Sequence, residues 1–299
     1  MKIIISGASG LVGCALTSVL RAENHSVFHL VRPGRALAPD EIRWDPHAAY
    51  VDVPELEAAD AVIHLNGANI SERRWTPQRK QILRSSRIDS TRVLVDSLAQ
   101  LRQKPRAFVS ASAVGYYGNR GDEILTEASE AGRDFLSLLA RDWEAEASRA
   151  AQSGIRTVIL RFGVILSGQG GALPQMIRPF RFGVGGRLGH GRQWLSWIAL
   201  EDVAGIVRLA IADSRFHGPV NVVSPAPVQN ADFARVLGRV LHRPAIFPAP
   251  EFMLRLAWGE MADALLLASQ RAAPEQLLAA NYPFQFPDLE ATLKKILLT

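Results

Sequence analysis

The stretch Lys2-Ile3-Ile4-Ile5-Ser6, followed directly by Gly7-Ala8-Ser9-Gly10-Leu11-Val12-Gly13, decides the fold of this 299-residue chain. The first five residues are a short, mostly β-branched run, which predicts a buried strand. The glycine-rich segment then leads into a helical pattern from Cys14 to Arg21. A strand, a glycine turn and a helix N-terminus together bind anions, because free backbone N–H groups and the positive end of the helix dipole point at the ligand.

The three glycines of this turn have separate tasks. Gly7 allows the tight turn, Gly10 lets the backbone approach a pyrophosphate, and Gly13 lets the helix pack closely on the strand. Their spacing is G-x-x-G-x-x-G, which differs from the simplest dinucleotide fingerprint. Placed directly after the opening strand, the turn predicts a dinucleotide site. The contacts expected from it are Gly7, Ser9, Gly10, Leu11, Val12 and Gly13.

Apolar runs alternate with helical stretches through the first two thirds of the chain. Further strands are expected at Ser26–Val31, Ala61–Leu65, Ala107–Ala111, Arg156–Arg161 and Val220–Val223. Helices are expected at Arg79–Gln100, Phe135–Ala151, Asn230–Leu241 and Glu251–Ser269. Near-continuous apolar strands separated by helices indicate a parallel sheet covered on both faces. Right-handed crossovers then predict an α/β fold of the doubly wound Rossmann type.

The composition of the sequence changes after about Gly163. Ser167–Gly191 is dense in glycine and contains two prolines, so we expect a loop-rich segment that suits a substrate cleft. We therefore expect a dinucleotide-binding domain at 1–165, to which the strand near 220–223 returns, and a substrate-side region from 166 to 247. Four arginines fall in or next to this segment: Arg178, Arg181, Arg187 and Arg192.

The composition is that of an ordinary globular protein, with 48% hydrophobic and 21% charged residues. No run approaches the roughly 18 apolar residues of a membrane span, so we expect no membrane partner. Because the chain starts in a strand, we expect no targeting peptide and a cytoplasmic protein. The net charge is +5, but the arginines are spread along the chain, so we expect no nucleic-acid partner.

Cysteine and histidine usage limits the chemistry further. Cys14 is the only cysteine, so no internal disulfide forms, and we expect it to be a small buried core residue. None of the seven histidines has the spacing of a metal cluster, so we expect no metal.

The end of the second strand sets the preference for the dinucleotide. An NAD site usually has an acidic residue there, which bonds the ribose 2′-hydroxyl. Here Leu30 to Gly34 contains no acid, and Arg32 occupies the position that can pair with a 2′-phosphate. We therefore expect NADP(H) in preference to NAD(H). The alternative is that Arg32 is a solvated residue at a strand end.

With these features the chain resembles the extended short-chain dehydrogenases/reductases of the NAD-dependent epimerase/dehydratase family. The resemblance is carried by the glycine turn, Asp60–Ala68, Val109–Gly118 and Ser196–Val203. More narrowly, it is similar to the epimerase-family group that has a small C-terminal domain, here 248–299. Marks of that group are Trp44-Asp45, Arg74-Trp75-Thr76, Asp142-Trp143-Glu144, Gly191–Ile198 and Ser269-Gln270-Arg271.

The resemblance implies a nicotinamide-nucleotide enzyme that acts on a nucleotide sugar. The usual chemistry of the superfamily needs a tyrosine, a lysine four residues later and a serine or threonine. Ser112 matches the serine position, with Ser110 as the alternative, and Ser110 is also expected to contact the cofactor. The expected tyrosine position falls at Phe135 or Leu136, and no lysine occurs between Lys104 and Lys294. Tyr116 or Tyr117 is then the candidate acid/base, the alternative being that both are packing residues.

The resemblance also implies further contacts. Leu65, Asn66 and Gly67 should lie beside the adenine ribose and the pyrophosphate, Arg87 should reach a phosphate, and Gly163 should touch the nicotinamide through its backbone. For both Arg87 and the arginine-rich segment, the alternative is a solvated basic surface. The residues expected to bind substrate are Arg178, Arg187, Arg192, Gln193, Trp194 and Trp197.

Two functions therefore remain open. The first is an NADP(H)-dependent epimerase- or dehydratase-like oxidoreductase with an atypical active site. The second is an NADP(H)-binding sensor or regulator with little or no turnover. The missing tyrosine–lysine pair favours the second, and the cleft rich in arginine and tryptophan favours the first.

Overall fold

The structure is a computed structural model that describes residues 1–34 and 36–298. Its contacts divide the chain into two compact units. The first unit comprises Met1–Ser112, Leu139–Leu160 and Ala204–Val220. The second comprises Ala113–Leu138, Arg161–Val203 and Asn221–Thr299.

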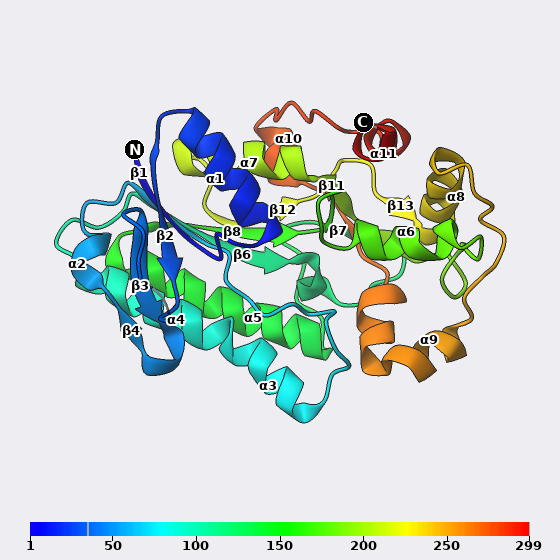
Figure 1. Ribbon diagram of the computed structural model, residues 1–299, viewed down its shortest axis with the longest axis horizontal. Coiled ribbons are helices and arrows are strands. Elements are labelled where there is room, and N and C mark those ends of the chain that lie inside the picture. The colour runs from blue at the N-terminus through cyan, green and yellow to red at the C-terminus, as the bar shows by residue number, and fades with distance from the viewer. Residues whose placement is uncertain (35, 299) are drawn as a thin grey trace. The chain divides into compact units, whose positions relative to one another are not determined.

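An eight-stranded sheet forms the centre of the first unit (Figure 1). Its strand order is β12-β8-β6-β5-β1-β2-β3-β4. β1 pairs in parallel with β2 and β5, β5 with β6, and β2 with β3, whereas the edge strand β4 is antiparallel to β3. The strands are β1 Lys2–Ser6, β2 Ser26–Val31, β3 Glu41–Asp45, β4 Tyr50–Val51, β5 Ala61–His64, β6 Ala107–Ala113, β8 Arg156–Phe162 and β12 Gly218–Val222.

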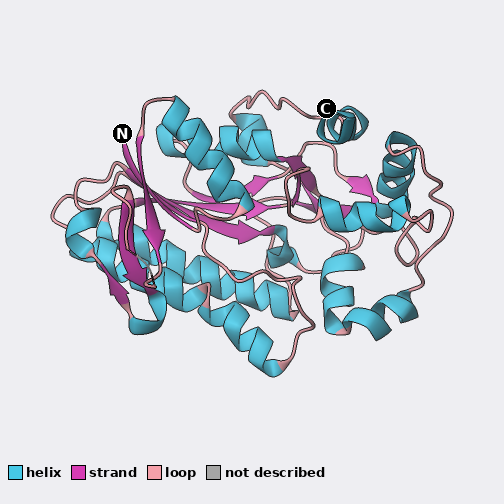
Figure 2. Cartoon of the chain, viewed as in Figure 1, coloured by secondary structure: helices cyan, strands magenta, loops and turns pink. Residues whose placement is uncertain are grey.

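Helices cover both faces of this sheet, with α1 and α7 on one side and α4 and α5 on the other (Figures 1 and 2). The helices of this part are α1 Leu11–Ala22, α2 Val53–Leu56, α3 Pro77–Ser85, α4 Ile88–Gln100, α5 Phe135–Ser148 and α7 Leu200–Ala212, with 3₁₀ turns at Pro46–Ala48 and Arg149–Ser153. The strand interiors, such as Ile3–Ile5 and Phe108, are fully buried. This is the doubly wound Rossmann-type arrangement predicted from the sequence.

The register of the parallel strands aligns their carboxyl ends. Ser6 lies opposite His64 across β1 and β5, and His64 lies opposite Ser110 across β5 and β6. The glycine turn after Ser6, the loop after His64 and the end of β6 therefore emerge at the same edge of the sheet. In open α/β sheets, this edge is where ligands bind.

The second unit is built from short strand pairs and helices. β7 (Ile124–Leu125) pairs with β14 (Arg271–Ala272), β9 (Val164–Leu166) with β11 (Trp197–Ala199), and β10 (Trp194–Leu195) with β13 (Val228–Gln229). Its helices are α6 Leu173–Arg181, α8 Asn230–Val240, α9 Glu251–Trp258, α10 Glu275–Ala279 and α11 Leu289–Leu298, with a 3₁₀ turn at Val114–Tyr117 and a π-helical turn at Ala262–Leu266. One of its hydrophobic cores packs α6, α8 and α11 together with the fully buried Trp197.

Three expected elements differ from the structure by more than a few end residues. The helix predicted over Arg79–Gln100 is two helices, because the chain breaks at Ser86 and Arg87. The helix predicted over Glu251–Ser269 ends at Trp258, since Gly259 follows it with φ +59°. The segment predicted to be loop-rich contains α6, which starts with Pro174 in its first turn, where proline is favoured.

Cys14 was expected to be buried, and this prediction was wrong, because its side chain is exposed. The buried face of α1 consists of Gly13, Leu16, Thr17 and Leu20. Cys14 is one position out of phase with that face, and its Sγ donates to the carbonyl oxygen of Ala8 at 3.3 Å.

In the part of the chain that the structure describes, no helix is long and apolar enough to span a membrane.

Candidate functional site

The glycine turn is packed so tightly that side chains are excluded from it. Gly7 has φ +72°, and a Cβ on it would lie 2.8 Å from the carbonyl carbon of Leu65. A Cβ on Gly13 would lie 2.4 Å from the carbonyl oxygen of Gly7, within the turn itself. Gly13 therefore lets the helix close onto its own turn, and Gly7 lets the turn lie against the loop after β5.

The N-terminus of α1 is left open for an anion. Gly10 is the N-cap, no side chain caps the helix, and its first turn contains no acidic residue. The first N–H groups of a helix lack intrahelical partners, and the helix dipole adds a positive potential there. The turn has both features of a phosphate cradle, and exposed Ser9 lies within it.

The loop after β5 faces the same edge of the sheet. Leu65 and Asn66 are half-buried and Gly67 is exposed. Asn66 donates through Nδ2 to the carbonyl oxygen of Ser86 at 3.2 Å, which ties the loop to the break between α3 and α4. That break places Arg87 against Gly67, where a Cβ on the glycine would lie 3.1 Å from the guanidinium carbon.

Arg87 is a largely buried cation. Its guanidinium donates to the carbonyl oxygens of Leu83 and Ala68 at 3.3 and 3.1 Å, and it lies 5.3 Å from the ring centre of Trp143. Burial, with a smaller contribution from nearby Arg79, lowers the pKa of Arg87 to about 10. Within residues 1–34 and 36–298, no carboxylate forms an ion pair with Arg87. A buried cation with only neutral partners is the group that an anionic ligand would stabilise.

A buried hydrogen-bond network supports the strand ends beneath this site. His64 is fully buried, with Nδ1 2.6 Å from the hydroxyl of Ser6 and Nε2 2.9 Å from the hydroxyl of Thr91. Thr91 donates to the carbonyl oxygen of Arg87 and accepts from the indole of Trp143, so His64 must donate through Nε2 and accept from Ser6. Burial lowers the pKa of His64 to about 3, so the ring is neutral.

The end of β6 brings the predicted Ser112 to a carboxylate. Ser112 donates through Oγ to Oε1 of Glu144 on α5 at 2.6 Å, and both residues are buried. Ser110 is fully buried two positions earlier, and its hydroxyl contacts the carbonyl oxygen of Ala111 at 3.4 Å. The sequence analysis named Ser112 as a candidate but did not name Glu144 as one. The only available signal was the Asp142-Trp143-Glu144 mark of the family group.

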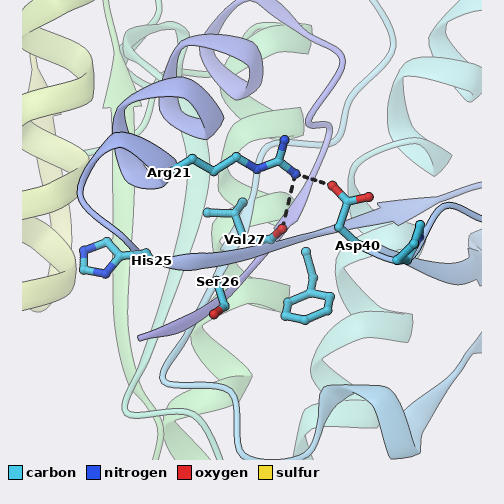
Figure 3. A pocket seen from close by; sticks show the side chains of 7 residues that line it. Arg21, His25, Ser26, Val27 and Asp40 are labelled. Atoms are coloured by element: carbon cyan, nitrogen blue, oxygen red, sulfur yellow. Dashed lines mark hydrogen bonds and ion pairs between the residues drawn. The ribbon is translucent and has the colours of Figure 1, made fainter.

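Arg32 follows β2 directly and is exposed. A pocket of about 460 Å³ lies instead at the start of β2, where it is lined by Arg21, His25 and Asp40 among others (Figure 3). Arg21 pairs there with Asp40 and contacts the carbonyl oxygen of Val27. This pocket is at the amino end of the strand, whereas the glycine turn is at the carboxyl end, so it does not belong to the candidate site.

The first unit thus brings together the glycine turn, the loop after β5, Arg87 and the serines of β6. The remaining predicted residues lie in the second unit. They are Tyr116, Tyr117, Gly163, Arg178, Arg187, Arg192, Gln193, Trp194 and Trp197.

The two tyrosines differ in their surroundings. Tyr117 is fully buried, donates to Oδ1 of Asn221 at 2.7 Å and accepts from Arg161 at 3.0 Å. Burial raises the pKa of Tyr117 to about 12. Tyr116 is half-buried, and the Arg161 guanidinium lies 3.6 Å from its ring centre. An acid/base tyrosine needs a pKa nearer neutrality, so the environment of Tyr117 opposes proton transfer and suits a structural hydroxyl.

Gly163 lies where backbone segments meet. A Cβ there would be 2.6 Å from the carbonyl oxygen of Ser196, and its N–H donates to the carbonyl oxygen of Val222 at 3.1 Å. The fully buried Trp197 donates through its indole to the carbonyl oxygen of Ala226 at 2.9 Å.

Gln193 and Trp194 follow one another but serve different contacts. Gln193 is buried, and its amide donates to the carbonyl oxygens of Leu188 and Leu266, both at 3.0 Å. Trp194 is half-buried, donates to Asp122 at 2.7 Å and has the Arg271 guanidinium 4.3 Å from its ring centre. Arg271 was not among the predicted site residues, although it lies in the Ser269-Gln270-Arg271 mark.

The predicted arginines Arg178, Arg187 and Arg192 are all exposed. Within the described residues, none of the three forms an ion pair with a carboxylate. The described residues also contain no group of three or more histidine, cysteine, aspartate or glutamate side chains placed to hold a metal ion.

Comparison with known proteins gives matches over nearly the whole chain. Residues 3–223 match the model of the NAD dependent epimerase/dehydratase family, and residues 249–296 match a domain of unknown function, DUF1731. Epimerase family protein MT2273 of Mycobacterium tuberculosis is 45% identical over 282 residues, which cover 94% of this chain and 93% of that protein.

Two solved structures are similar throughout this chain. The crystal structure of human epimerase family protein SDR39U1 with NADPH has a TM-score of 0.90 and 35% identity, and the match covers 99% of both chains. The nucleoside-diphosphate sugar epimerase of Corynebacterium glutamicum has a TM-score of 0.83 and 37% identity, covering 99% of this chain and 58% of the other.

Proposed function

This chain belongs to the NAD-dependent epimerase/dehydratase family, and we propose that it is an NADP(H)-binding oxidoreductase whose substrate is a nucleotide sugar. One observation carries the proposal. An uncapped glycine turn and the largely buried Arg87, which has no carboxylate partner among the described residues, lie at the same sheet edge. Both favour a ligand with several phosphates. The similar human protein was solved with NADPH, and the similar corynebacterial protein is named a nucleoside-diphosphate sugar epimerase.

In this proposal the residues of the first unit hold the cofactor. The turn from Gly7 to Gly13 takes the pyrophosphate, Arg87 balances phosphate charge, and exposed Arg32 pairs with the 2′-phosphate. Residues 65–67 line the nucleotide, and Ser110 supports the edge from within. When bound, the cofactor supplies a nicotinamide ring that accepts or donates hydride.

The residues proposed for the substrate come from the second unit. Exposed Arg178, Arg187 and Arg192 supply charges for a diphosphate, and half-buried Trp194 supplies a ring face. Gln193 and Trp197 hold this segment in place through their buried hydrogen bonds. Gly163 remains the proposed backbone contact to the nicotinamide.

The second candidate function is an NADP(H)-binding regulator without turnover. The raised pKa of Tyr117, caused by burial, favours it, because that hydroxyl is poorly suited to move a proton at neutral pH. The first function therefore needs another proton acceptor, whereas a regulator needs none.

Titration with the two reduced cofactors tests the proposal. We expect NADPH to quench the protein fluorescence at a lower concentration than NADH. Arg32→Ser should weaken NADPH binding about 10-fold and leave NADH binding unchanged, because only NADPH has the 2′-phosphate. Arg43→Ser, which removes an exposed arginine from β3, is the matched control.

Turnover then separates the two functions. The protein is incubated with NADP⁺ and either UDP-glucose or UDP-glucuronic acid, and reduced cofactor and sugar products are measured. Product formation supports the oxidoreductase. Tight NADPH binding without product supports the regulator, and failure to bind either cofactor refutes both functions.

A further inference from the structure

The buried pair formed by Ser112 and Glu144 lies within the first unit, at the end of a central strand. The Ser112 hydroxyl donates to Oε1 of Glu144 at 2.6 Å, the short distance expected of a hydroxyl bonded to a carboxylate. The two residues are 3% and 8% exposed, so water hardly competes for this bond. A serine whose proton is already directed at a carboxylate has its lone pairs available to a second partner.

The pair is also close in the sheet to the proposed cofactor cradle. Ser110 is aligned with His64, and His64 with Ser6, the residue before the glycine turn. Ser112 lies two residues further along β6, with its side chain on the same side of the strand as that of Ser110. Ala113, the next residue, is exposed, so the strand reaches solvent at this point. The serine is therefore at the edge where a ligand meets the sheet.

From this geometry we infer that Ser112 and Glu144 form a proton relay that replaces the missing tyrosine–lysine pair. The inference rests on the proposed oxidoreductase function. When a substrate alcohol is oxidised, its C–H bond breaks and the hydride passes to NADP⁺. The alcohol proton passes to Ser112 Oγ as the Ser112 proton passes to Oε1 of Glu144. The carbonyl product and NADPH form, and the carboxyl group holds the proton until solvent removes it. Reduction of a carbonyl runs the same steps in reverse.

The alternatives for proton transfer are the two tyrosines. The hydroxyl of the fully buried Tyr117 already donates its proton to Asn221 and accepts from Arg161. Tyr116 packs edge to face against Tyr117, with Arg161 over its ring. The Ser112 hydroxyl is, by contrast, bonded directly to a group that can accept a proton. Ser112 would contact the substrate, and Glu144 would act through Ser112.

Several charged groups lie on the elements around Glu144. Asp142, two residues earlier on α5, pairs with Arg84, and the ring of the adjacent Trp143 has the Arg87 guanidinium beside it. β8, the strand next to β6, contains the buried Arg161 one residue before its last residue, Phe162. The arginines keep their charge throughout the usable pH range. A carboxyl titration that is lost specifically in Glu144→Gln therefore belongs to Glu144.

The test compares full-length variants for NADPH binding and for turnover of UDP-glucose and UDP-glucuronic acid. Glu144→Gln keeps an oxygen that accepts from Ser112 but cannot take the proton. We expect kcat to fall by about 100-fold or more in Glu144→Gln and in Ser112→Ala, with NADPH affinity within about 3-fold of the parent. Glu144→Asp should restore part of kcat and shift the pH profile. Glu146→Gln on the same helix is the matched control, and Tyr116→Phe tests the competing acid/base.

A second measurement needs no substrate. Difference infrared spectra between pH 5 and pH 9, with Glu144→Gln as reference, report whether the Glu144 carboxyl ionises. An ionised carboxylate at neutral pH supports the relay, and a carboxyl that stays protonated throughout overturns it. The relay alone is overturned if Glu144→Gln retains full kcat or if Tyr116→Phe alone abolishes kcat. NADPH binding by the parent protein without any turnover overturns the relay together with the oxidoreductase function on which it rests. Failure to bind NADPH identifies failure of the proposed function instead.

Discussion

Replacing Arg87 by methionine should separate cofactor binding from folding. The substitution keeps an unbranched side chain beside Trp143 and removes the buried charge next to Gly67. If Arg87 only stabilises the fold, this substitution lowers thermal stability, whereas if Arg87 binds an anion, it lowers the affinity for that anion. We expect NADPH binding to weaken strongly while the unliganded protein keeps its thermal stability.

The magnitudes follow from the surroundings of Arg87. Its pKa falls to about 10 because of burial, with Arg79 adding to the effect. Relative to the ordinary value of 12.5, this corresponds to about 3 kcal/mol of unfavourable charge burial in the unliganded protein. Methionine relieves that cost but leaves the carbonyl oxygens of Leu83 and Ala68 without this donor, a loss of about 1–3 kcal/mol. The two terms nearly cancel. Loss of a charged hydrogen bond to phosphate costs about 1.5–3 kcal/mol, or about 10- to 150-fold in Kd.

Fluorescence titration with NADPH and thermal unfolding without ligand measure the two quantities. Arg84→Met is the matched control, because Arg84 lies on the same stretch and is ion-paired with Asp142. The reasoning is refuted if Arg87→Met lowers Tm by many degrees and binds NADPH as tightly as the parent. That result would make Arg87 a structural residue.

Three further substitutions or conditions give defined outcomes. Gly13→Ala places a Cβ 2.4 Å from the carbonyl oxygen of Gly7. The free energy of unfolding, measured by thermal unfolding, should therefore fall by about 1–3 kcal/mol, and the affinity for NADPH, measured by titration, should fall more than about 10-fold. The pKa of His64 is lowered by burial to about 3 from 6.5, so the unfolded chain binds a proton that the folded protein excludes below pH 6.5. In urea unfolding, the free energy of unfolding should stay constant above about pH 6.5 and fall by about 2 kcal/mol by about pH 5. The assignment is contradicted if His64→Gln shows the same dependence of stability on pH as the parent protein. Tyr117→Phe leaves Oδ1 of Asn221 without its donor and should cost about 1–3 kcal/mol of stability with kcat unchanged, whereas loss of kcat at full stability would make Tyr117 the acid/base.

The strands that fix the fold could be predicted from the sequence, because their burial is continuous. The predicted bounds of Lys2–Ser6 and Ser26–Val31 are confirmed residue for residue. The strand Glu41–Asp45 was missed because it lies next to the edge strand and its burial alternates, so that only Ile42 and Trp44 are buried. A five-residue alternation that contains three charged residues is too weak a pattern to separate from a loop.

The positions of breaks were harder to predict than the elements. Apolar spacing continues across Ser86 and Arg87, so periodicity alone predicts one helix where the structure has two. Only the tertiary contacts of that break, such as the bond from Asn66 to the carbonyl oxygen of Ser86, show why it is there. Cys14 illustrates a phase error of one residue, which in a helix is enough to move a side chain from the core to solvent.

The candidate site was predictable where it consists of backbone and unpredictable where it depends on side-chain pairing. Glycines signal close approach by their position after a strand, and the packing around Gly7 and Gly13 agrees with that reading. The Ser112–Glu144 bond joins residues 32 positions apart in the chain, and no spacing rule relates a strand end to the third turn of a later helix. Because the usual tyrosine and lysine are absent, the Ser112–Glu144 pair is the group from which proton transfer in this chain has to be explained. It decides whether a chain that retains the cradle for a dinucleotide also retains a route for the proton that hydride transfer leaves behind.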